Sequence, residues 1–368
     1  MRQLLQHSVR WTVWVPVLAL LVLAVTWGTY PGGLVLSVCA ALLAGAVLAA
    51  VHHAEVVAHR VGEPFGSLLL AVAVTVIEVA LIVTLMVTTS KDTSTLARDT
   101  VFAAVMISLN GIVGASLLIG ALKHRLAVLN PEGTGSALAT VVTLAGVCLL
   151  LPRFTTTEPG PEFSPSQLAF AAVASLVLYG LFVFTQTIQH RDFFLPVRPG
   201  QLGPVDEDQD GHADPPSNAV ALTSLGLLLA ALVAVVGLAK VCSPAIEKAV
   251  LDLGFPATFV GVIIALLVLL PESIAAFRAA SRDRVQISLN LALGSAMASI
   301  GLTIPTIAVA SIWLDGPLSL GLGELEIVLL LLTVVVSILT VVPGRAKPLQ
   351  GGVHLVLLAA FLFLSIRP

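Results

Sequence analysis

The sequence predicts an all-α integral membrane protein with eleven transmembrane helices, one N-terminal helix followed by two inverted five-helix repeats. The first observation is composition, because 57% of the 368 residues are hydrophobic, 11% are charged and the mean hydropathy is +1.03. Ordinary soluble domains carry roughly 25% charged residues. The second observation is a set of eleven apolar segments, and the third is a tetrapeptide that recurs beside a glutamate in each half. These features place the chain in a bilayer.

The eleven apolar segments approach the length of about 20 residues that a helix needs to cross a hydrocarbon core of about 30 Å. Leu, Val and Ala fill them without strict alternation, which favours helices over the strands of a barrel. The first segment is long and lacks a small-x-small cleavage pattern, so we interpret it as a retained helix. The segments comprise residues 11–29, 34–51, 67–87, 100–122, 136–151, 167–187, 219–241, 258–280, 287–313, 325–342 and 353–366.

Four parts follow from this order of segments. An N-terminal transmembrane helix occupies residues 1–33, the first five-helix repeat 34–188, an acidic linker 189–218 and the second five-helix repeat 219–368. An odd number of spans places the termini on opposite sides, and 12 of the 18 Lys and Arg residues fall on the side of the N-terminus. Because cytoplasmic loops carry the excess of Lys and Arg, we expect the N-terminus and the linker in the cytoplasm and the C-terminus outside.

The linker centres on the sequence Asp206-Glu207-Asp208-Gln209-Asp210-Gly211. Carboxylates at alternate positions before a glycine resemble the start of an EF-hand loop. Ser217 stands where such a loop needs its bidentate glutamate. We therefore interpret the segment as a solvated acidic linker, with weak cation capture or regulation by Asp206, Glu207, Asp208 and Asp210 as the alternative. The net charge of −3 offers no basic surface to nucleic acid.

The recurring tetrapeptide indicates an internal repeat. Ile-Ser-Leu-Asn occurs at 107–110 and again at 287–290, each time in the span that follows a glutamate-bearing span. Glu78 lies in the third span and Glu272 in the eighth. Corresponding spans are therefore five apart, and an odd offset makes them cross the membrane in opposite directions. Transporters with such inverted repeats place their ion site near the midplane where the repeats meet.

The two intramembrane glutamates are the candidate cation and proton ligands. Placing a carboxylate at mid-bilayer costs at least about 2.5 kcal/mol, so such residues line a cavity or pair with a partner. No basic residue stands at comparable depth in either span, so Glu78 and Glu272 are each expected to be protonated or to bind a cation. The alternative is that both are protonated and serve only as hydrogen-bond donors between helices.

Several neighbours are expected to complete the site. Pro271 removes the backbone donor just before Glu272 and frees the carbonyl of Leu267, which predicts a kink or a break in that helix. Carbonyl and carboxylate oxygens are hard ligands of the kind that calcium takes. Side-chain oxygens near the glutamates or in the tetrapeptides are candidate supporting ligands, although a Ser or Asn in a membrane helix is more often an interhelical hydrogen-bonding group. These candidates are Thr75, Ser108, Asn110, Ser288, Asn290 and Ser295.

At these residues the sequence resembles the calcium/cation antiporter superfamily, and within it the cation/proton exchangers of the bacterial ChaA type. The similarity extends over essentially the whole chain and is strongest at 62–66, at 270–272 and from 288 to Pro305. The resemblance implies an extra N-terminal helix before two inverted repeats and a location in the bacterial inner membrane. It also maps the two essential glutamates of the family onto Glu78 and Glu272 and requires no cofactor.

Two departures from the family pattern lie next to the candidate site. Many exchangers carry Gly-Asn four and three residues before each glutamate, whereas this chain has Val74-Thr75 and Val268-Leu269. Asn110 and Asn290 stand where many relatives have glycine. Because side-chain oxygens beside the glutamates tune selectivity, both departures bear on which ion is carried.

The expected function is export of cytoplasmic Ca²⁺ in exchange for H⁺ by alternating access. Two carboxylates that release two protons can receive one divalent ion, so protons and calcium compete for the same ligands. Antiport of Na⁺ or K⁺ against H⁺ by the same fold is the first alternative, and a passive cation channel is the second. An intramembrane hydrolase is the least favoured, because the spans carry no Asp pair, Ser-His pair or zinc-ligand cluster. We therefore expect a transporter and not an enzyme, and leave its oligomeric state open.

Overall fold

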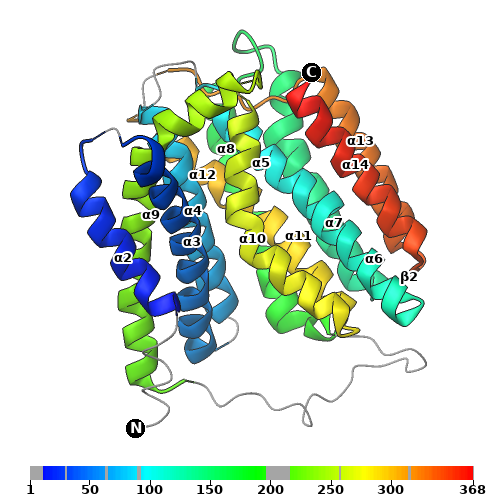
Figure 1. Ribbon diagram of the computed structural model, residues 1–368. Coiled ribbons are helices and arrows are strands. Elements are labelled where there is room, and N and C mark those ends of the chain that lie inside the picture. Colours follow the sequence, from blue (N-terminus) through cyan, green and yellow to red (C-terminus); the bar gives the residue numbers. More distant parts are fainter. Residues whose placement is uncertain are drawn as a thin grey trace. The chain divides into compact units, whose positions relative to one another are not determined.

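A helix lies in each of the eleven predicted spans, as the computed structural model shows (Figure 1). Within the residues that the structure describes, ten helices are long and apolar enough to cross a membrane, and α2 (Trp11–Thr26) is a shorter apolar helix of 16 residues. The predicted all-α membrane architecture is thus confirmed. The structure describes residues 11–29, 31–62, 65–88, 93–195, 216–256, 258–313 and 316–367.

The helices form two compact units, and each unit takes helices from both halves of the chain. Unit 1 comprises Met1–Thr93 and His212–Val260, and unit 2 comprises Ser94–Gly211 and Gly261–Pro368. The spatial units are therefore not the two sequence repeats. The division of the sequence into repeats at 34–188 and 219–368 stays a prediction.

The described part of unit 1 is a bundle of four helices. It contains α2, α3 (Gly33–Val61), α4 (Phe65–Thr88) and α9 (Asn218–Asp252), and α3 packs against each of the other three. The glycine at 62, with a φ of +77°, ends α3 in a backbone conformation that favours glycine. Helices α3 and α9 lead the two predicted repeats, so unit 1 brings the first helix of each repeat side by side.

Unit 2 holds the remaining elements. Two spans are interrupted: α5 and α6 flank a π-helical segment, η1, and α11 gives way to α12 at Leu302. The elements are α5 (Leu96–Met106), η1 (Ile107–Ile112), α6 (Val113–His124), β1 (Ala127–Val128), α7 (Pro131–Ala145), η2 (Gly146–Leu150), η3 (Leu151–Arg153), α8 (Pro165–Phe184), η4 (Thr185–Gln189), η5 (Arg191–Phe194), α10 (Phe259–Ser281), α11 (Val285–Gly301), α12 (Thr303–Ala310), α13 (Glu324–Val341), β2 (Arg345–Ala346) and α14 (Pro348–Ile366).

Capping residues set the starts of two helices in unit 2. Asn130 accepts backbone hydrogen bonds from Glu132 and Gly133 and precedes a proline, the arrangement that opens α7. Ser164 and Gln167 form a capping box at the start of α8. These local signals fix where the two helices begin.

The helices that carry the two tetrapeptides run in opposite directions within unit 2. At one end, Lys123 and His124 at the end of α6 hydrogen-bond to the carbonyl of Ser281, the last residue of α10, which lies just before α11. At the other end, the amide of Ser319 donates to the carbonyl of Ser94 at 3.0 Å, joining the segment after α12 to the segment before α5. The predicted antiparallel relation of these two spans is therefore confirmed.

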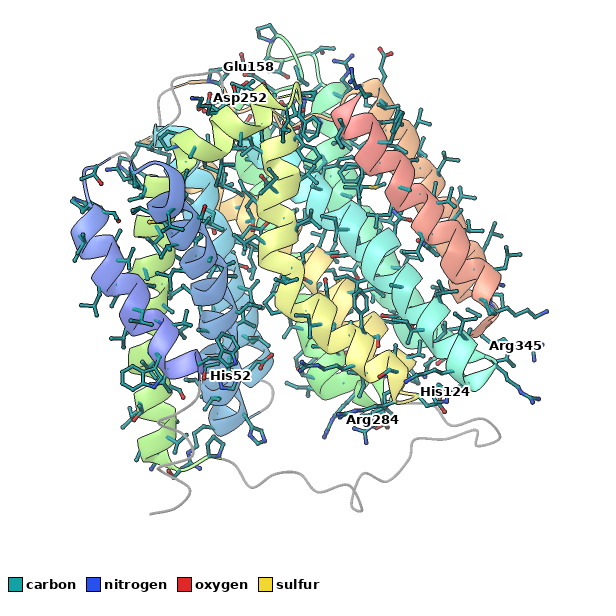
Figure 2. All side chains as sticks on the ribbon, in the orientation of Figure 1. His52, His124, Glu158, Asp252, Arg284 and Arg345 are labelled. Carbon is teal, nitrogen blue, oxygen red and sulfur yellow. The ribbon has the colours of Figure 1, made fainter. Side chains whose placement is uncertain are left out.

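Several basic residues of unit 2 lie together at one of its ends. In Figure 2, His124, Arg284 and Arg345 lie at the same end, and Glu158 lies at the opposite end. The antiparallel pair of β1 and β2 joins the loop after α6 to the loop after α13 at this basic end. The loops grouped on one side by the sequence tally therefore stand together in unit 2.

Glycines let α6 and α14 approach closely. A Cβ atom added to Gly351 would lie 2.6 Å from the backbone nitrogen of Leu118 and 2.7 Å from the carbonyl oxygen of Gly114. A Cβ atom added to Gly114 would lie 2.8 Å from the Cβ of His354. This contact between helices is available only to glycine, as is common where membrane helices pack through small residues.

Candidate cation site

Glu78 and Glu272 occupy the same position in their helices. Glu78 follows Phe65, the first residue of α4, by 13 positions, and Glu272 follows Phe259, the first residue of α10, by the same 13 positions. Each carboxyl group is thus held near the middle of a long apolar helix. Glu78 belongs to unit 1 and Glu272 to unit 2, and that the two carboxylates share one ion stays a prediction.

Glu78 is buried in unit 1. Its exposed fraction is 2%, and Ile77 and Ile82 on the same helix are also buried. Glu78 is the only ionisable residue of α4, which packs against α3 and α9. A carboxyl group at this depth is charged only if a cation or strong hydrogen bonds offset the loss of hydration.

Glu272 is half-buried on α10, directly after Pro271. Of the two outcomes predicted at Pro271, a kink or a break, the break is wrong, because α10 is continuous from Phe259 to Ser281. In Figure 1 the upper and lower halves of α10 run in different directions, so the helix bends without ending. Prolines are tolerated in membrane helices where neighbouring groups satisfy the freed backbone. The hydroxyl of Ser273 donates to the carbonyl of Leu269 at 2.7 Å in this turn.

Two of the candidate hydroxyl ligands are buried without a hydrogen-bond partner among the described residues. Thr75, one turn before Glu78, is 6% exposed, and Ser108 in η1 is fully buried. A buried hydroxyl that makes no hydrogen bond is costly to the fold. Both oxygens are therefore free to serve as ligands, Thr75 in unit 1 and Ser108 in unit 2.

The amide of Asn110 already has protein partners. Its Nδ2 donates to Thr333 Oγ1 at 2.9 Å, and its Oδ1 lies 3.2 Å from Nδ1 of His354. Thr333 and His354 come from α13 and α14, so Asn110 ties η1 to the last two helices of unit 2. Because both ends of this amide are engaged, we leave Asn110 out of the ligand set proposed below.

Asn290 is held in the same manner on α11. Its Nδ2 donates to the carbonyl of Phe194 at 2.6 Å, and its Oδ1 accepts from Gln286 at 2.8 Å. Gln286 in turn accepts a hydrogen bond from the amide of Asn130 at the start of α7. Asn290 therefore joins α11 to η5, and we leave it out of the ligand set as well.

The remaining candidate ligands, Ser288 and Ser295, both lie on α11. Ser288 donates to the carbonyl of Ala276, one turn after Glu272, at 2.6 Å, so the second tetrapeptide packs directly against the helix of that glutamate. Ser295 lies half-buried further along α11. Helix α11 also packs against η1, so unit 2 brings the two tetrapeptides together. The acidic residues Asp206, Glu207, Asp208 and Asp210 lie outside the described residues.

Sequence reasoning missed one residue of this region. His354 is completely buried in α14, where it contacts Asn110 and Thr340. The available signal was that His354 is the only ionisable residue in the last apolar span, 353–366. An ionisable residue inside a membrane helix points to a functional site by the same reasoning that selects the glutamates.

Comparison with known proteins gives consistent matches over most of the chain. The sequence profile described as sodium/calcium exchanger protein matches residues 31–188 and 223–367, on either side of the acidic linker. The chain is 45% identical over 332 residues to the putative ionic transporter y4hA of Sinorhizobium fredii, covering 89% of this chain and 88% of that protein. It is 34% identical over 351 residues to the sodium-potassium/proton antiporter ChaA of Escherichia coli, covering 94% and 93%.

A solved structure shares the fold. The H⁺/Ca²⁺ exchanger CAX aligns with a TM-score of 0.68 at 15% identity, covering 96% of this chain and 86% of that one. At this level of identity the likeness concerns the arrangement of helices alone.

Proposed function

Because the chain belongs to the sodium/calcium exchanger family, we propose that it is a secondary active antiporter that exports Ca²⁺ in exchange for H⁺. The observation that supports this proposal best is that Glu78 and Glu272 stand at corresponding positions near the middle of two long apolar helices, with Glu78 buried. A carboxyl group in such a position exchanges a proton for a cation more readily than it stays charged and empty.

The proposed cycle uses one set of ligands for both ions. Glu78 and Glu272 release two protons when they bind one calcium ion and regain them when the ion leaves, so no net charge moves. The hydroxyls of Thr75 and Ser108 are proposed as supporting ligands because both are buried without a hydrogen-bond partner among the described residues. A state with two empty, charged carboxylates is disfavoured in low dielectric, and this penalty couples the two fluxes.

Transport of Na⁺ or K⁺ in exchange for H⁺ is the second candidate. It is favoured by the relative at 34% identity whose name is sodium-potassium/proton antiporter. The side chains at Val74-Thr75 and Val268-Leu269, which replace the Gly-Asn pairs of many exchangers, point the same way because they change the oxygen atoms offered near each glutamate. The carboxylates and the coupling to protons stay as in the first candidate.

We also propose that the protein lies in the bacterial inner membrane with its N-terminus in the cytoplasm. The basic loops that include His124, Arg284 and Arg345 stand at one end of unit 2 (Figure 2), and such an end faces the cytoplasm in most membrane proteins.

Flux in proteoliposomes tests the proposal and separates the candidates. Purified protein is reconstituted, a pH gradient is imposed, and uptake of Ca²⁺, Na⁺ and K⁺ is measured separately. We expect Ca²⁺ uptake that rises with the gradient and collapses when a protonophore removes it. Uptake of Na⁺ or K⁺ alone would favour the second candidate. Cation uptake that ignores the pH gradient would contradict antiport and indicate a passive channel.

Replacing Thr75 by valine tests its proposed role as a ligand. The substitution keeps the shape and removes a buried hydroxyl, so we expect an unchanged or raised melting temperature and a cation affinity lowered about tenfold, the effect of losing about 1.4 kcal/mol. Thr100→Val is the matched control, because Thr100 is also buried but its hydroxyl donates to the carbonyl of Leu96. That control should lose some stability and keep its affinity. Normal affinity in Thr75→Val would remove Thr75 from the ligand set.

A further inference from the structure

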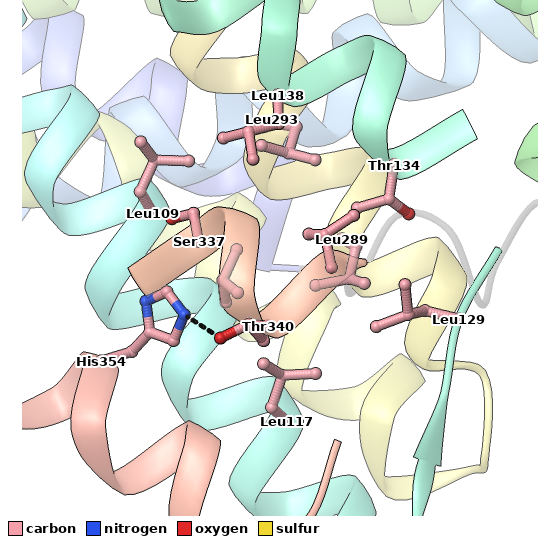
Figure 3. Close-up of a pocket in the computed structure, with 12 residues that line it drawn as sticks. Leu109, Leu117, Leu129, Thr134, Leu138, Leu289, Leu293, Ser337, Thr340 and His354 are labelled. Carbon is pink, nitrogen blue, oxygen red and sulfur yellow. Dashed lines mark hydrogen bonds between the residues drawn. The ribbon is translucent and has the colours of Figure 1, made fainter. Parts of the chain in front are cut away.

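His354 stands at the centre of a hydrogen-bond network in unit 2. Its side chain is completely buried on α14, with Nδ1 3.2 Å from Asn110 Oδ1 and Nε2 3.2 Å from Thr340 Oγ1. Figure 3 shows the contact with Thr340 at the edge of a small cavity. The network therefore links three elements, η1, α13 and α14, through one imidazole ring.

One assignment of the hydrogens places a proton on each nitrogen of the ring. In it the hydroxyl of Thr340 donates its single proton to the carbonyl of Val336 at 2.8 Å and accepts from Nε2 of His354. Nδ2 of Asn110 donates to Thr333, so the amide oxygen is the atom that faces Nδ1. Both ring nitrogens thus face acceptors. A ring that donates from both nitrogens is the protonated, positively charged imidazolium.

A second arrangement satisfies the same groups with a neutral ring. If the Asn110 amide turns over, its Nδ2 donates to an unprotonated Nδ1 of His354 and its Oδ1 accepts from the hydroxyl of Thr333. Nε2 of His354 still donates to Thr340. Gain or loss of one proton is therefore matched by a half-turn of one amide, and the hydroxyl of Thr333 turns from Sδ of Met106 to Oδ1 of Asn110. A proton-sensitive switch requires two such hydrogen-bonding arrangements, one for each charge state of the ring.

The groups around the ring are otherwise neutral in the part of the chain that the structure describes. Helix α14 packs against α6, η1, α13 and β2. The ionisable residues of these elements stand at helix ends or in the strand and do not contact the ring, and η1 has none. They are Lys123, His124, Glu324, Glu326 and Arg345. The charge of His354 is thus governed by its hydrogen bonds and by its burial, not by a paired carboxylate.

The cavity beside the ring offers a polar contact to one small molecule. Its volume of about 20 Å³ accommodates a single water, and its lining includes His354, Thr340 and Ser337 among apolar side chains (Figure 3). The hydroxyl of Ser337 is buried and has no hydrogen-bond partner within the described residues. A water in this cavity would accept from or donate to Ser337 and give a proton a first step toward the ring.

We propose that His354 is a proton-binding site separate from the two glutamates, and that its charge sets the orientation of the Asn110 amide in η1. The amide belongs to the first tetrapeptide and lies two residues after Ser108. Because η1 is a π-helical interruption in an otherwise regular span, it is the part of that span that rearranges at least cost. Proton binding at His354 does not depend on the proposed transport function, whereas its effect on transport does.

Solid-state NMR of protein labelled with ¹⁵N at histidine and asparagine, in lipid bilayers, tests the site directly. The ring signals of His354 are identified by their loss in His354→Gln, and the side-chain signal of Asn110 by its loss in Asn110→Gln. We expect the ring to change from neutral to charged as the pH falls, and the Asn110 signal to move with the same midpoint. Thr340→Val removes an acceptor that the charged ring needs, and should shift the midpoint lower by about one pH unit.

His59→Gln, at an exposed position near the end of α3, is the matched control and should leave both titrations unchanged. A His354 ring that stays neutral at every pH at which the protein is folded would overturn the proposal. So would a ring that titrates without any response from Asn110.

Transport measurements keep this proposal distinct from the proposed function. In His354→Gln we expect cation flux to persist with a flattened dependence on pH, whereas in Glu78→Gln we expect flux to disappear while the titration of His354 remains. A wild-type protein without proton-coupled flux but with a titrating His354 would contradict the proposed function alone. Coupled flux with the same pH dependence in wild type and His354→Gln would contradict the effect of His354 on transport.

Discussion

Proton-driven cation flux is expected to fall by on the order of 100-fold when either Glu78 or Glu272 is replaced by glutamine, because loss of one buried charged ligand costs about 3 kcal/mol. Glutamine keeps the size and the carbonyl oxygen of glutamate but can neither release a proton nor carry charge. The measurement is initial uptake driven by a pH gradient in everted membrane vesicles, normalised to the amount of protein in the membrane.

Glu132→Gln is the matched control for this loss. Glu132 lies exposed in the first turn of α7, so the same chemical change there should leave uptake near the wild-type rate. The two glutamate variants should also remain folded, since glutamine is less costly to bury than a charged carboxylate. Wild-type uptake in either Glu78→Gln or Glu272→Gln would contradict the proposed site.

Substituting Gly351 by alanine is expected to destabilise unit 2 by about 1 to 3 kcal/mol, the range found when a packed core is overfilled. The added Cβ would lie within 2.7 Å of the backbone atoms of Leu118 and Gly114, and backbone cannot move aside as a flexible side chain can. Helices α6 and α14 must therefore separate. Thermal unfolding in detergent, followed by intrinsic fluorescence, measures the effect.

The neighbouring glycine provides the control. A Cβ atom at Gly352 meets no atom within 4 Å, so Gly352→Ala should keep the wild-type melting temperature or exceed it slightly. Equal melting temperatures for the two variants would show that the close approach of α6 and α14 does not contribute to stability.

Hydropathy located every span but not the full extent of every helix. The segment predicted at 34–51 is α3 (Gly33–Val61), and the segment predicted at 219–241 is α9 (Asn218–Asp252). Both helices continue through polar residues, because hydrogen bonding within a helix persists beyond the apolar stretch until a stop signal is met. For α3 that signal is the positive φ of Gly62.

The part of the candidate site that could be predicted from the sequence is the pair of glutamates, because each can be recognised without knowing its neighbours in the fold. Glu78 and Glu272 stand out because a charge in an apolar run is costly whatever surrounds it. The partners of Asn110 were not predictable, since Thr333 and His354 are 223 and 244 residues away in the sequence and meet it only in the folded unit. The sequence left open whether α10 kinks or breaks at Pro271, because packed membrane helices tolerate proline where neighbouring groups satisfy the freed backbone.

Unit 1 combines helices from both halves of the chain, and this affects how the protein folds during its synthesis. Helix α3 begins at Gly33, and its partner α9 begins at Asn218, which is 185 residues later. At about 5 to 20 residues per second, translation delivers α9 roughly 10 to 40 seconds after α3 has entered the membrane. During that interval the surface of α3 that packs against α9 in the folded unit stays uncovered by that helix. We expect the nascent chain to depend on the insertion machinery for most of its synthesis, and a truncation before α9 to be degraded.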